Sequence, residues 1–232
     1  MKVTTFNIQK FGKSKLSDPF VQKTLIKIVS RYDIIVILEV VDSSGDSVDN
    51  FLEELNKFNK THHYTLEIST RLGRGNYKEQ FMFLYRDDLV DLVGSYQYKD
   101  NQSGDEDAFA REPYVLRFKN SEGTCELYDV FQNVKMKWKT DVKHYVSDNE
   151  MKTIRIRSDE NFHWLITDDV DTTASTRNDN TYDRIVVYGD DMLKGAFPNS
   201  AKPFNVFTGA EEVEVELKKK RQRKTHEEHL ND

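Results

Sequence analysis

Five consecutive aliphatic residues, Ile-Ile-Val-Ile-Leu at positions 34–38, are the feature that most constrains the fold of this chain. A run of this length, rich in β-branched side chains and free of Gly and Pro, is typical of a strand that is buried on both faces of its sheet. Glu39 follows the run directly. A carboxylate in that place is costly unless it meets a cation, a hydrogen-bond donor or water. We therefore expect Glu39 to have a polar or ionic partner.

The residues before this run predict a β-α-β unit. Residues 2–8 alternate in polarity and are rich in β-formers, and Ser17-Asp18-Pro19 is a typical helix start. Apolar side chains at helical spacing follow that start, namely Phe20, Leu25, Ile28 and Val29. The pattern predicts two parallel neighbouring strands joined by a right-handed crossover.

The rest of the chain favours a mixed α/β domain with a large sheet content. A second amphipathic helix is indicated by Val48, Phe51, Leu52 and Leu55. Strands are predicted over residues 63–70, 79–86, 92–98 and 113–118, a helix over 126–138, and short strands over 153–157, 163–167, 183–189 and 213–217. Because no segment rich in Pro or Gly marks a boundary, we expect one domain over residues 1–217.

Composition and charge narrow the class of protein. The chain has 232 residues, of which 37% are hydrophobic, so it can bury a sizeable core. Cys125 is the single cysteine, which excludes an internal disulfide, and we expect no membrane span and no signal peptide. The net charge is −6, although residues 218–232 hold six Lys or Arg against three acids. This basic tail predicts either a disordered terminus or a segment that binds nucleic acid, and we expect a cytoplasmic protein, with nuclear entry through the tail as the alternative.

Carboxylates and amides cluster at several strand ends. Asn7 and Glu39 follow two strands predicted to be parallel, so they could converge at one edge of the sheet as oxygen ligands for Mg²⁺. The alternative is a Glu39 that only caps a neighbouring loop. Residues 100–113 and 168–175 are acidic loops that either enclose Ca²⁺ or are simply solvated.

Taken together, these stretches resemble the deoxyribonuclease I-like family of the endonuclease/exonuclease/phosphatase superfamily, especially its deoxyribonuclease gamma-like branch. The resembling motifs are TTFNIQKFG (4–12), IIVILEVVDSS (34–44), STRLGRGNYKEQFMFLYR (69–86), DAFAREP (107–113), TIRIRSDENFHWLI (153–166), DVDTTAS (169–175) and TYDRIVVYGD (181–190). The resemblance implies a four-layer α/β/β/α sandwich. It also implies hydrolysis of DNA phosphodiester bonds with Mg²⁺ and Ca²⁺ as cofactors.

Carried over motif by motif, the resemblance assigns roles to particular residues. Asn7 and Glu39 match the Mg²⁺ site, while Tyr77 and Arg111 match groups that contact the DNA backbone. Glu79 and Asp183 match two carboxylates that each orient a catalytic histidine, so Glu39, Glu79 and Asp183 are the candidate catalytic carboxylates. The residues that match calcium loops are Asp107, Phe109 and Glu112 in one loop and Asp171 and Thr173 in the other.

Three segments that carry the catalytic histidines and a Gly-Asp-Phe-Asn motif in the family have no counterpart here. The gaps fall after residue 124, after residue 142 and at residues 206–212, where VFTGAEE replaces a Ser-Asp-His segment. In the family two of these segments include central strands, so we expect a sandwich with central strands missing. The chain has six histidines, and none stands in a catalytic context. Two hypotheses follow: a metal-dependent DNA endonuclease, or a catalytically inactive relative that binds DNA or metal.

The resemblance also implies the partners. The expected partner is double-stranded DNA, contacted through its backbone by a monomer, and no membrane is expected. Actin binding, which one branch of the family shows, is not supported by Thr65 and Leu66 in the corresponding strand.

Overall fold

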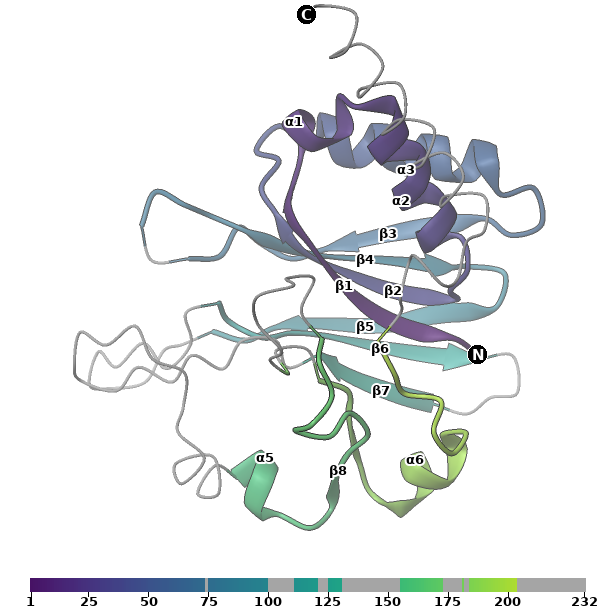
Figure 1. Ribbon diagram of the computed structural model, residues 1–232, viewed down its shortest axis with the longest axis vertical. Coiled ribbons are helices and arrows are strands. Elements are labelled where there is room, and N and C mark those ends of the chain that lie inside the picture. Colours follow the sequence, from purple (N-terminus) through teal and green to yellow (C-terminus); the bar gives the residue numbers. More distant parts are fainter. Residues whose placement is uncertain are drawn as a thin grey trace, which may run out of the picture. The chain divides into compact units, whose positions relative to one another are not determined.

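The computed structural model describes residues 1–73, 75–99, 111–120, 125–130, 155–172, 181 and 184–203 (Figure 1). The chain divides into two compact units, residues 1–147 and residues 148–232. Each unit is described by itself below. The expectation of one domain over residues 1–217 stays a prediction, and the tail at 218–232 lies outside the described residues.

The predicted β-α-β unit is present at the start of the first unit. Strand β1 (Val3–Phe11) pairs in parallel with β2 (Ile34–Val40), and helix α2 (Pro19–Val29) connects them. Asp18 caps α2 by accepting hydrogen bonds from the backbone N–H groups of Phe20 (2.8 Å) and Val21 (3.3 Å). Pro19 occupies the first turn, where no backbone donor is needed.

Strand β2 lies inside a four-stranded sheet of order β1-β2-β4-β3. Strands β3 (Tyr64–Ile68) and β4 (Gln80–Arg86) run antiparallel to each other, and β4 also runs antiparallel to β2. Residues 34–38 are at most 2% exposed, which confirms a strand buried on both faces.

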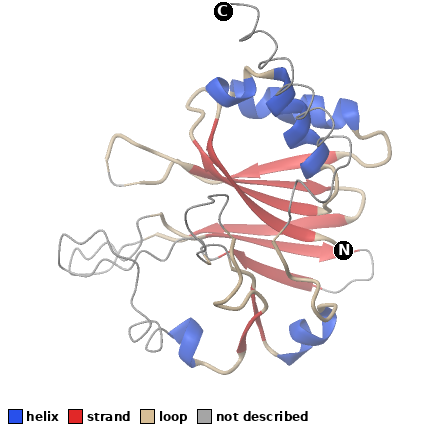
Figure 2. Cartoon of the chain, in the orientation of Figure 1, coloured by secondary structure: helices blue, strands red, loops and turns tan. Residues whose placement is uncertain are grey.

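Helices cover one face of this sheet (Figure 2). They are α1 (Lys13–Leu16), α2 and α3 (Asp46–Phe58). Their apolar side chains and those of one face of the sheet form a single core cluster, in which the rings of Phe11 and Phe51 meet edge to face at 5.3 Å. The helical spacing of Val48, Phe51 and Leu55 is confirmed, since all three are at most 4% exposed.

A second sheet packs on the other face. Its order is β5-β6-β7, with β5 at Val90–Gln97, β6 at Tyr114–Asn120 and β7 at Cys125–Val130. A second core cluster joins the sheets and contains two edge-to-face ring pairs, Phe83 with Tyr114 at 5.9 Å and Tyr85 with Phe118 at 5.0 Å. The first unit is therefore a helix-sheet-sheet sandwich, and the predicted α/β sandwich class is confirmed.

Two predicted elements are wrong. Residues 126–130, assigned to a helix, form strand β7, which pairs with β6 from Cys125↔Lys119 to Val130↔Tyr114. The neighbouring strand β6 pairs with the backbone N–H and C=O groups of this segment, and such tertiary pairing overrides a weak helical pattern. In the second unit, Arg155–Ser158, assigned to a strand, forms the short helix α5. The alternation of TIRIR was too short to distinguish a strand from one helical turn.

The described part of the second unit is small. Strands β8 (Phe162–Trp164) and β9 (Val186–Tyr188) are antiparallel, and α6 (Asp190–Gly195) follows them. The Trp164 ring lies against the guanidinium of Arg157 at 4.2 Å and that of Arg184 at 5.6 Å. Asp168 forms ion pairs with both of these arginines. Aromatic stacking and a shared carboxylate therefore hold Arg157 of α5 and Arg184, which precedes β9, around Trp164 of β8.

A network of polar side chains secures the amino-terminal end of β2. The Arg86 guanidinium donates from Nη1 to Asp33 (2.6 Å), from Nε to the Tyr64 hydroxyl (2.9 Å) and from Nη2 to the Ser30 carbonyl (2.7 Å). The other Asp33 oxygen accepts from the Lys2 backbone N–H at 2.6 Å. The Asp33 and Arg86 side chains are 11% and 13% exposed. This network, called the Arg86 network below, links α2, β2, β3 and β4.

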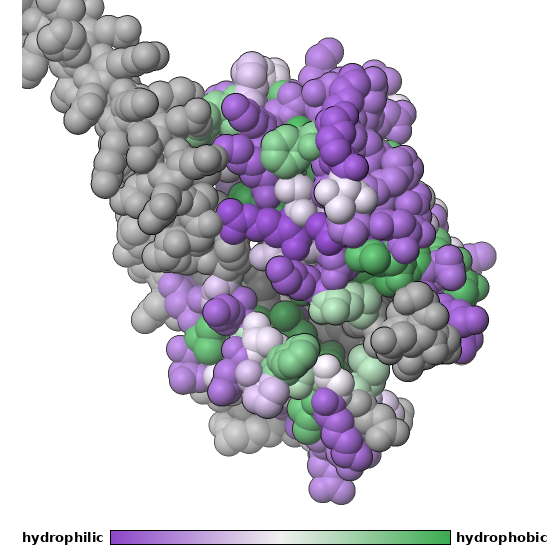
Figure 3. Space-filling view, turned by 90° about the vertical axis from the view of Figure 1, so that its right-hand side faces the viewer, coloured by the Kyte–Doolittle hydropathy of each residue, from purple (hydrophilic) through white to green (hydrophobic). Residues whose placement is uncertain are grey.

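The described surface shows no large apolar patch on the side that Figure 3 presents. On the side shown in Figure 3, the described surface is mostly hydrophilic, with small hydrophobic areas. Among the described helices, none is long and apolar enough to cross a bilayer.

Candidate functional site

Asn7 and Glu39 meet where the regular pairing of the parallel strands β1 and β2 is interrupted, between Asn7 and Phe11. The Asn7 Nδ2 donates a hydrogen bond to the Glu39 Oε1 at 2.9 Å. The backbone N–H of Lys10 donates to the Glu39 Oε2 at 3.3 Å, and the backbone N–H of Gln9 donates to the Asn7 Oδ1 at 2.9 Å. The two side chains therefore meet at this edge of the sheet, as predicted. Hydrogen-bond donors orient both the Asn7 amide oxygen and the Glu39 carboxylate.

The backbone at this edge is strained. Gln9, Lys10 and Glu39 have φ values of +50°, +59° and +56°, a region that residues other than glycine rarely adopt. The strand register shifts at the same place, between Asn7 and Phe11 in β1 and between Ile37 and Val40 in β2. Strain of this kind costs about 1–3 kcal/mol per residue and concentrates at functional sites. The irregular backbone therefore marks the ends of β1 and β2 as a candidate site.

The chain after Glu39 is fixed by Asp42. Its Oδ2 accepts from the backbone N–H groups of Ser47 (2.7 Å) and Val48 (3.3 Å), which begin α3. Partial burial acts to raise the pKa of Asp42, but these hydrogen bonds and those from Ser44 outweigh it and lower the pKa. The first turn of α3 is thus tied to the segment that carries Glu39.

The loop between β3 and β4 brings further side chains to the same edge. Leu72 and Glu79 form an isolated bridge through two backbone hydrogen bonds of 2.7 and 2.9 Å. Gln80 pairs with Val40, so Glu79 lies at the same end of the sheet as Glu39. The Glu79 Oε2 accepts from Arg111 Nε at 2.9 Å, and the two side chains are 15% and 19% exposed.

The charges of Glu39, Glu79 and Arg111 all act on the pKa of Tyr77. Partial burial raises the pKa of the Tyr77 hydroxyl, and the charge and hydrogen bond of Glu79 and the charge of Glu39 raise it further. Arg111 acts in the opposite direction. The Tyr77 side chain is nevertheless about half exposed. Asn7, Glu39, Tyr77, Glu79 and Arg111 are therefore neighbours in one polar region, called the Glu39 edge below.

Comparison with known proteins gives this region a family context. Residues 4–192 match the endonuclease/exonuclease/phosphatase family. The chain is 37% identical over 237 residues to deoxyribonuclease-1 of Bos taurus, covering 88% of this chain and 83% of that protein. It is 34% identical over 238 residues to deoxyribonuclease gamma of Homo sapiens, covering 88% of this chain and 77% of that protein.

The chain belongs to the deoxyribonuclease I-like family. Among the residues that this family assignment had singled out, the structure brings Asn7, Glu39, Tyr77, Glu79 and Arg111 to one end of the first unit. Glu112 lies just before strand β6, and its backbone carbonyl accepts a hydrogen bond from Gln97 Nε2 at 3.1 Å. Asp171 lies in the second unit. Asp107, Phe109, Thr173 and Asp183 lie outside the described residues.

The sequence reasoning missed two features of the Glu39 edge. The resemblance matched Glu79 to a carboxylate that orients a histidine, but it accepts a hydrogen bond from Nε of Arg111, which is 32 residues away. Gly73 was not singled out, although its φ of +132° and its contact with Arg111 place it inside this region. The glycines of GRGN (73–76) were the only signal that could have drawn attention to it.

The histidines described in the first unit lie far from Glu39 along the sheet. His62 and His63 precede β3, and their Nδ1 atoms contact Asp88 and Asp87 at 2.6 and 2.7 Å. Both aspartates follow β4, whereas Glu79 precedes it. These two histidines therefore stand at the opposite end of the sheet from the Glu39 edge.

The donor set at the Glu39 edge fits a hard divalent cation. A carboxylate and an amide oxygen are the ligand types of Mg²⁺, which usually keeps several waters and takes few protein ligands. Within the described ranges, no three His, Cys, Asp or Glu side chains gather as a metal site. Glu39 and Asn7 are the residues that could hold such a cation, with water completing its shell, once the Asn7 amide turned its oxygen from the Gln9 N–H toward Glu39.

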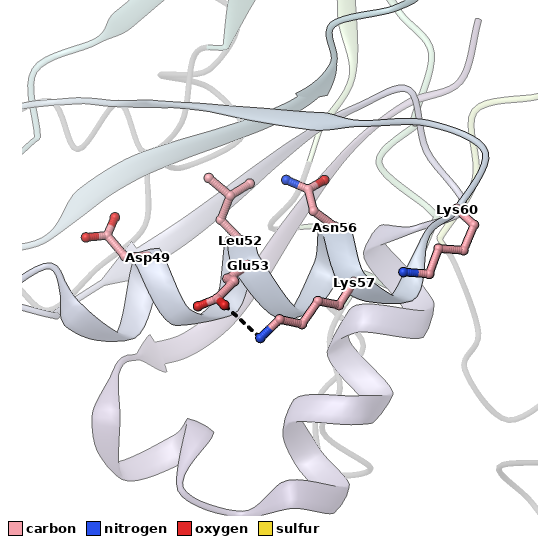
Figure 4. Close-up of a pocket in the computed structure, with 6 residues that line it drawn as sticks. All are labelled: Asp49, Leu52, Glu53, Asn56, Lys57 and Lys60. Carbon is pink, nitrogen blue, oxygen red and sulfur yellow. Dashed lines mark ion pairs between the residues drawn. The ribbon is translucent and has the colours of Figure 1, made fainter.

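A hollow on α3 is a separate feature (Figure 4). It is lined by Asp49, Leu52, Glu53, Asn56, Lys57 and Lys60. Glu53 and Lys57 form an exposed ion pair at 2.7 Å, a kind of contact that contributes little to stability. Asn56 bonds both backbone groups of Tyr64, which explains its position structurally. The hollow offers no chemistry related to the Glu39 edge.

Proposed function

We propose that this protein is a divalent-metal-dependent DNA endonuclease of the deoxyribonuclease I type, acting on double-stranded DNA. The observation that carries the proposal is the Asn7–Glu39 pair, held on strained strand ends beside Arg111. Relatives named deoxyribonuclease-1 and deoxyribonuclease gamma, which match over 88% of this chain, support the choice of substrate.

Each residue at the Glu39 edge has a role in this proposal. Asn7 and Glu39 bind the cation, which when bound polarises a phosphoryl oxygen and stabilises developing negative charge. Arg111 and Tyr77 contact the DNA backbone, since guanidinium and hydroxyl groups are common phosphate donors. The calcium-loop roles of Glu112 and Asp171 and the catalytic role of Asp183 remain part of the same proposal.

A second candidate is a relative that binds DNA without cleaving it. The Glu79–Arg111 ion pair favours it, because the carboxylate that the family would use to orient a histidine is occupied by an arginine instead. The positions of His62 and His63 at the opposite end of the sheet point the same way. General acid-base catalysis by histidine is worth roughly 10²–10⁴ in rate, so a relative without a catalytic histidine would lose much of its cleavage activity.

Nicking of supercoiled plasmid in Mg²⁺ plus Ca²⁺ separates the two candidates. The wild-type chain is compared with Glu39→Ala, with an EDTA control and with Glu53→Gln, which removes a carboxylate on α3 outside the Glu39 edge. Under the first candidate, wild type and Glu53→Gln nick, whereas Glu39→Ala and the EDTA sample do not. Duplex binding without nicking by the folded wild type establishes the second candidate and overturns the first.

A further inference from the structure

We propose that Glu79 is a positioning residue for Arg111, fixing its guanidinium so that the terminal nitrogens meet a phosphate of duplex DNA. The proposal rests on the DNA-binding role of the Glu39 edge, and it gives Glu79 a task that does not need a histidine.

Glu79 is a rigid support for this task. Its backbone is held on one side by the two hydrogen bonds to Leu72 and continues on the other side into β4. Its carboxylate is only 15% exposed, so its rotamers are restricted. An arginine tied to such a group loses little additional freedom when it binds a ligand, and this preorganisation strengthens binding.

Gly73 provides the space in which the guanidinium lies. A Cβ atom at residue 73 would stand 3.3 Å from both Cζ and Nη1 of Arg111 and 2.6 Å from the Tyr77 carbonyl oxygen. The φ of +132° is also a conformation that L side chains rarely adopt. Glu79 and Gly73 thus confine the guanidinium from two directions, one by a hydrogen bond and the other by close approach.

The chemistry of arginine explains why this arrangement suits a phosphate. A guanidinium carries five N–H donors in a rigid fork, and four of them belong to the terminal nitrogens. Glu79 takes its hydrogen bond from Nε, which sets the plane and direction of the fork. Phosphate is recognised well by a fork whose direction is fixed.

Electrostatics alone predicts the opposite effect of Glu79. A carboxylate near the DNA repels phosphate, so its removal should tighten binding if charge were all that mattered. If Glu79 positions Arg111, its removal weakens binding. The sign of the change therefore distinguishes the two roles.

The test measures the Kd of a short DNA duplex by fluorescence anisotropy in EDTA at several salt concentrations. Glu79→Gln removes the charge, Glu79→Asp keeps it but shortens the side chain, and Glu53→Gln is the matched control for net charge. We expect both Glu79 variants to raise Kd about tenfold, as when one partner of a positioned charge pair is altered, with Glu53→Gln near wild type. Thermal melts show whether each variant is folded. If Glu79→Gln does not fold, the charge-conserving Glu79→Asp carries the test.

A double-mutant cycle completes the test. In an Arg111→Met background, Glu79→Gln should no longer raise Kd, because the group that it positions is gone. Unchanged or tighter binding by both folded Glu79 variants overturns the inference, while wild-type binding leaves the proposed function standing. A folded wild type that does not bind duplex in EDTA even at low salt overturns the inference alone, because the proposed function is tested separately by nicking in Mg²⁺ plus Ca²⁺.

Discussion

The two ends of the four-stranded sheet each hold a largely buried Arg–carboxylate pair, but the surroundings of the pairs differ. Arg86 and Asp33 sit among regular strands, and all three guanidinium nitrogens of Arg86 bond to elements of the core. Arg111 and Glu79 lie beside Gly73 and near Glu39, and the backbone of Gly73 and Glu39 has positive φ. The same chemical pair therefore serves the fold at one end and, as proposed above, orients an arginine toward a ligand at the other.

The largest expected effect comes from breaking the Arg86 network. Arg86→Met leaves the Asp33 carboxylate buried without its partner, which should lower the free energy of unfolding by about 3–5 kcal/mol. Arg111→Met should cost less, about 1–2 kcal/mol, because it removes one hydrogen bond to Glu79, whereas Arg86→Met removes the hydrogen bonds to Asp33, Tyr64 and Ser30 together. Urea denaturation of both variants measures the difference. Equal losses would show that the two ends are energetically alike and would remove the basis of the comparison.

The strain at the Glu39 edge predicts a smaller effect, in which one substitution is more stable than another because it relieves the strain. Glu39→Gly should be more stable than Glu39→Ala by about 1 kcal/mol, because glycine accepts positive φ without a Cβ clash. The matched pair is Thr4→Gly and Thr4→Ala, at a regular position of β1, where glycine should be the less stable residue by about 0.5–1 kcal/mol. Chemical denaturation of the four variants tests this, and the same order at both positions would contradict a strained Glu39.

A third effect is a pH dependence at the junction of the two sheets. Burial and a hydrogen bond to Glu67 raise the pKa of Tyr114 to about 12, from 10.0 in the unfolded chain. The unfolded chain therefore loses this proton first as the pH rises. The stabilisation is complete below about pH 10 and is lost between about pH 10 and 12. The urea midpoint of wild type should fall more steeply over this range than that of Tyr114→Phe, and parallel curves would contradict the assignment.

Much of the Arg86 end could be predicted from sequence because its signals are local. The aliphatic run of β2, the Asp18-Pro19 start of α2 and the apolar spacing of α3 each lie within one element. Segment 126–130 was mistaken for a helix because its strand pairing with β6 is not local. The meeting of Asn7 and Glu39 was predictable, since parallel strands deliver their ends to one edge.

The Glu79–Arg111 pair could not be predicted in the same way. Its partners are separated by 32 residues and come from a loop and the approach to another strand. The family resemblance directed attention to a histidine partner for Glu79, and only the folded geometry reveals the arginine. Similarly, the role of Gly73 depends on which side chain lies beside it, which the loop sequence does not reveal.

The left-handed backbone of Glu39 has a consequence for how this protein can evolve. Most random substitutions destabilise a protein, yet at this position glycine would relieve strain while removing the carboxylate. Among replacements of this glutamate, selection for stability would therefore favour glycine, although the hydrogen bonds from Asn7 and Lys10 would be lost. In a lineage that no longer used the carboxylate, glycine at this position would be the substitution that reveals relaxed selection.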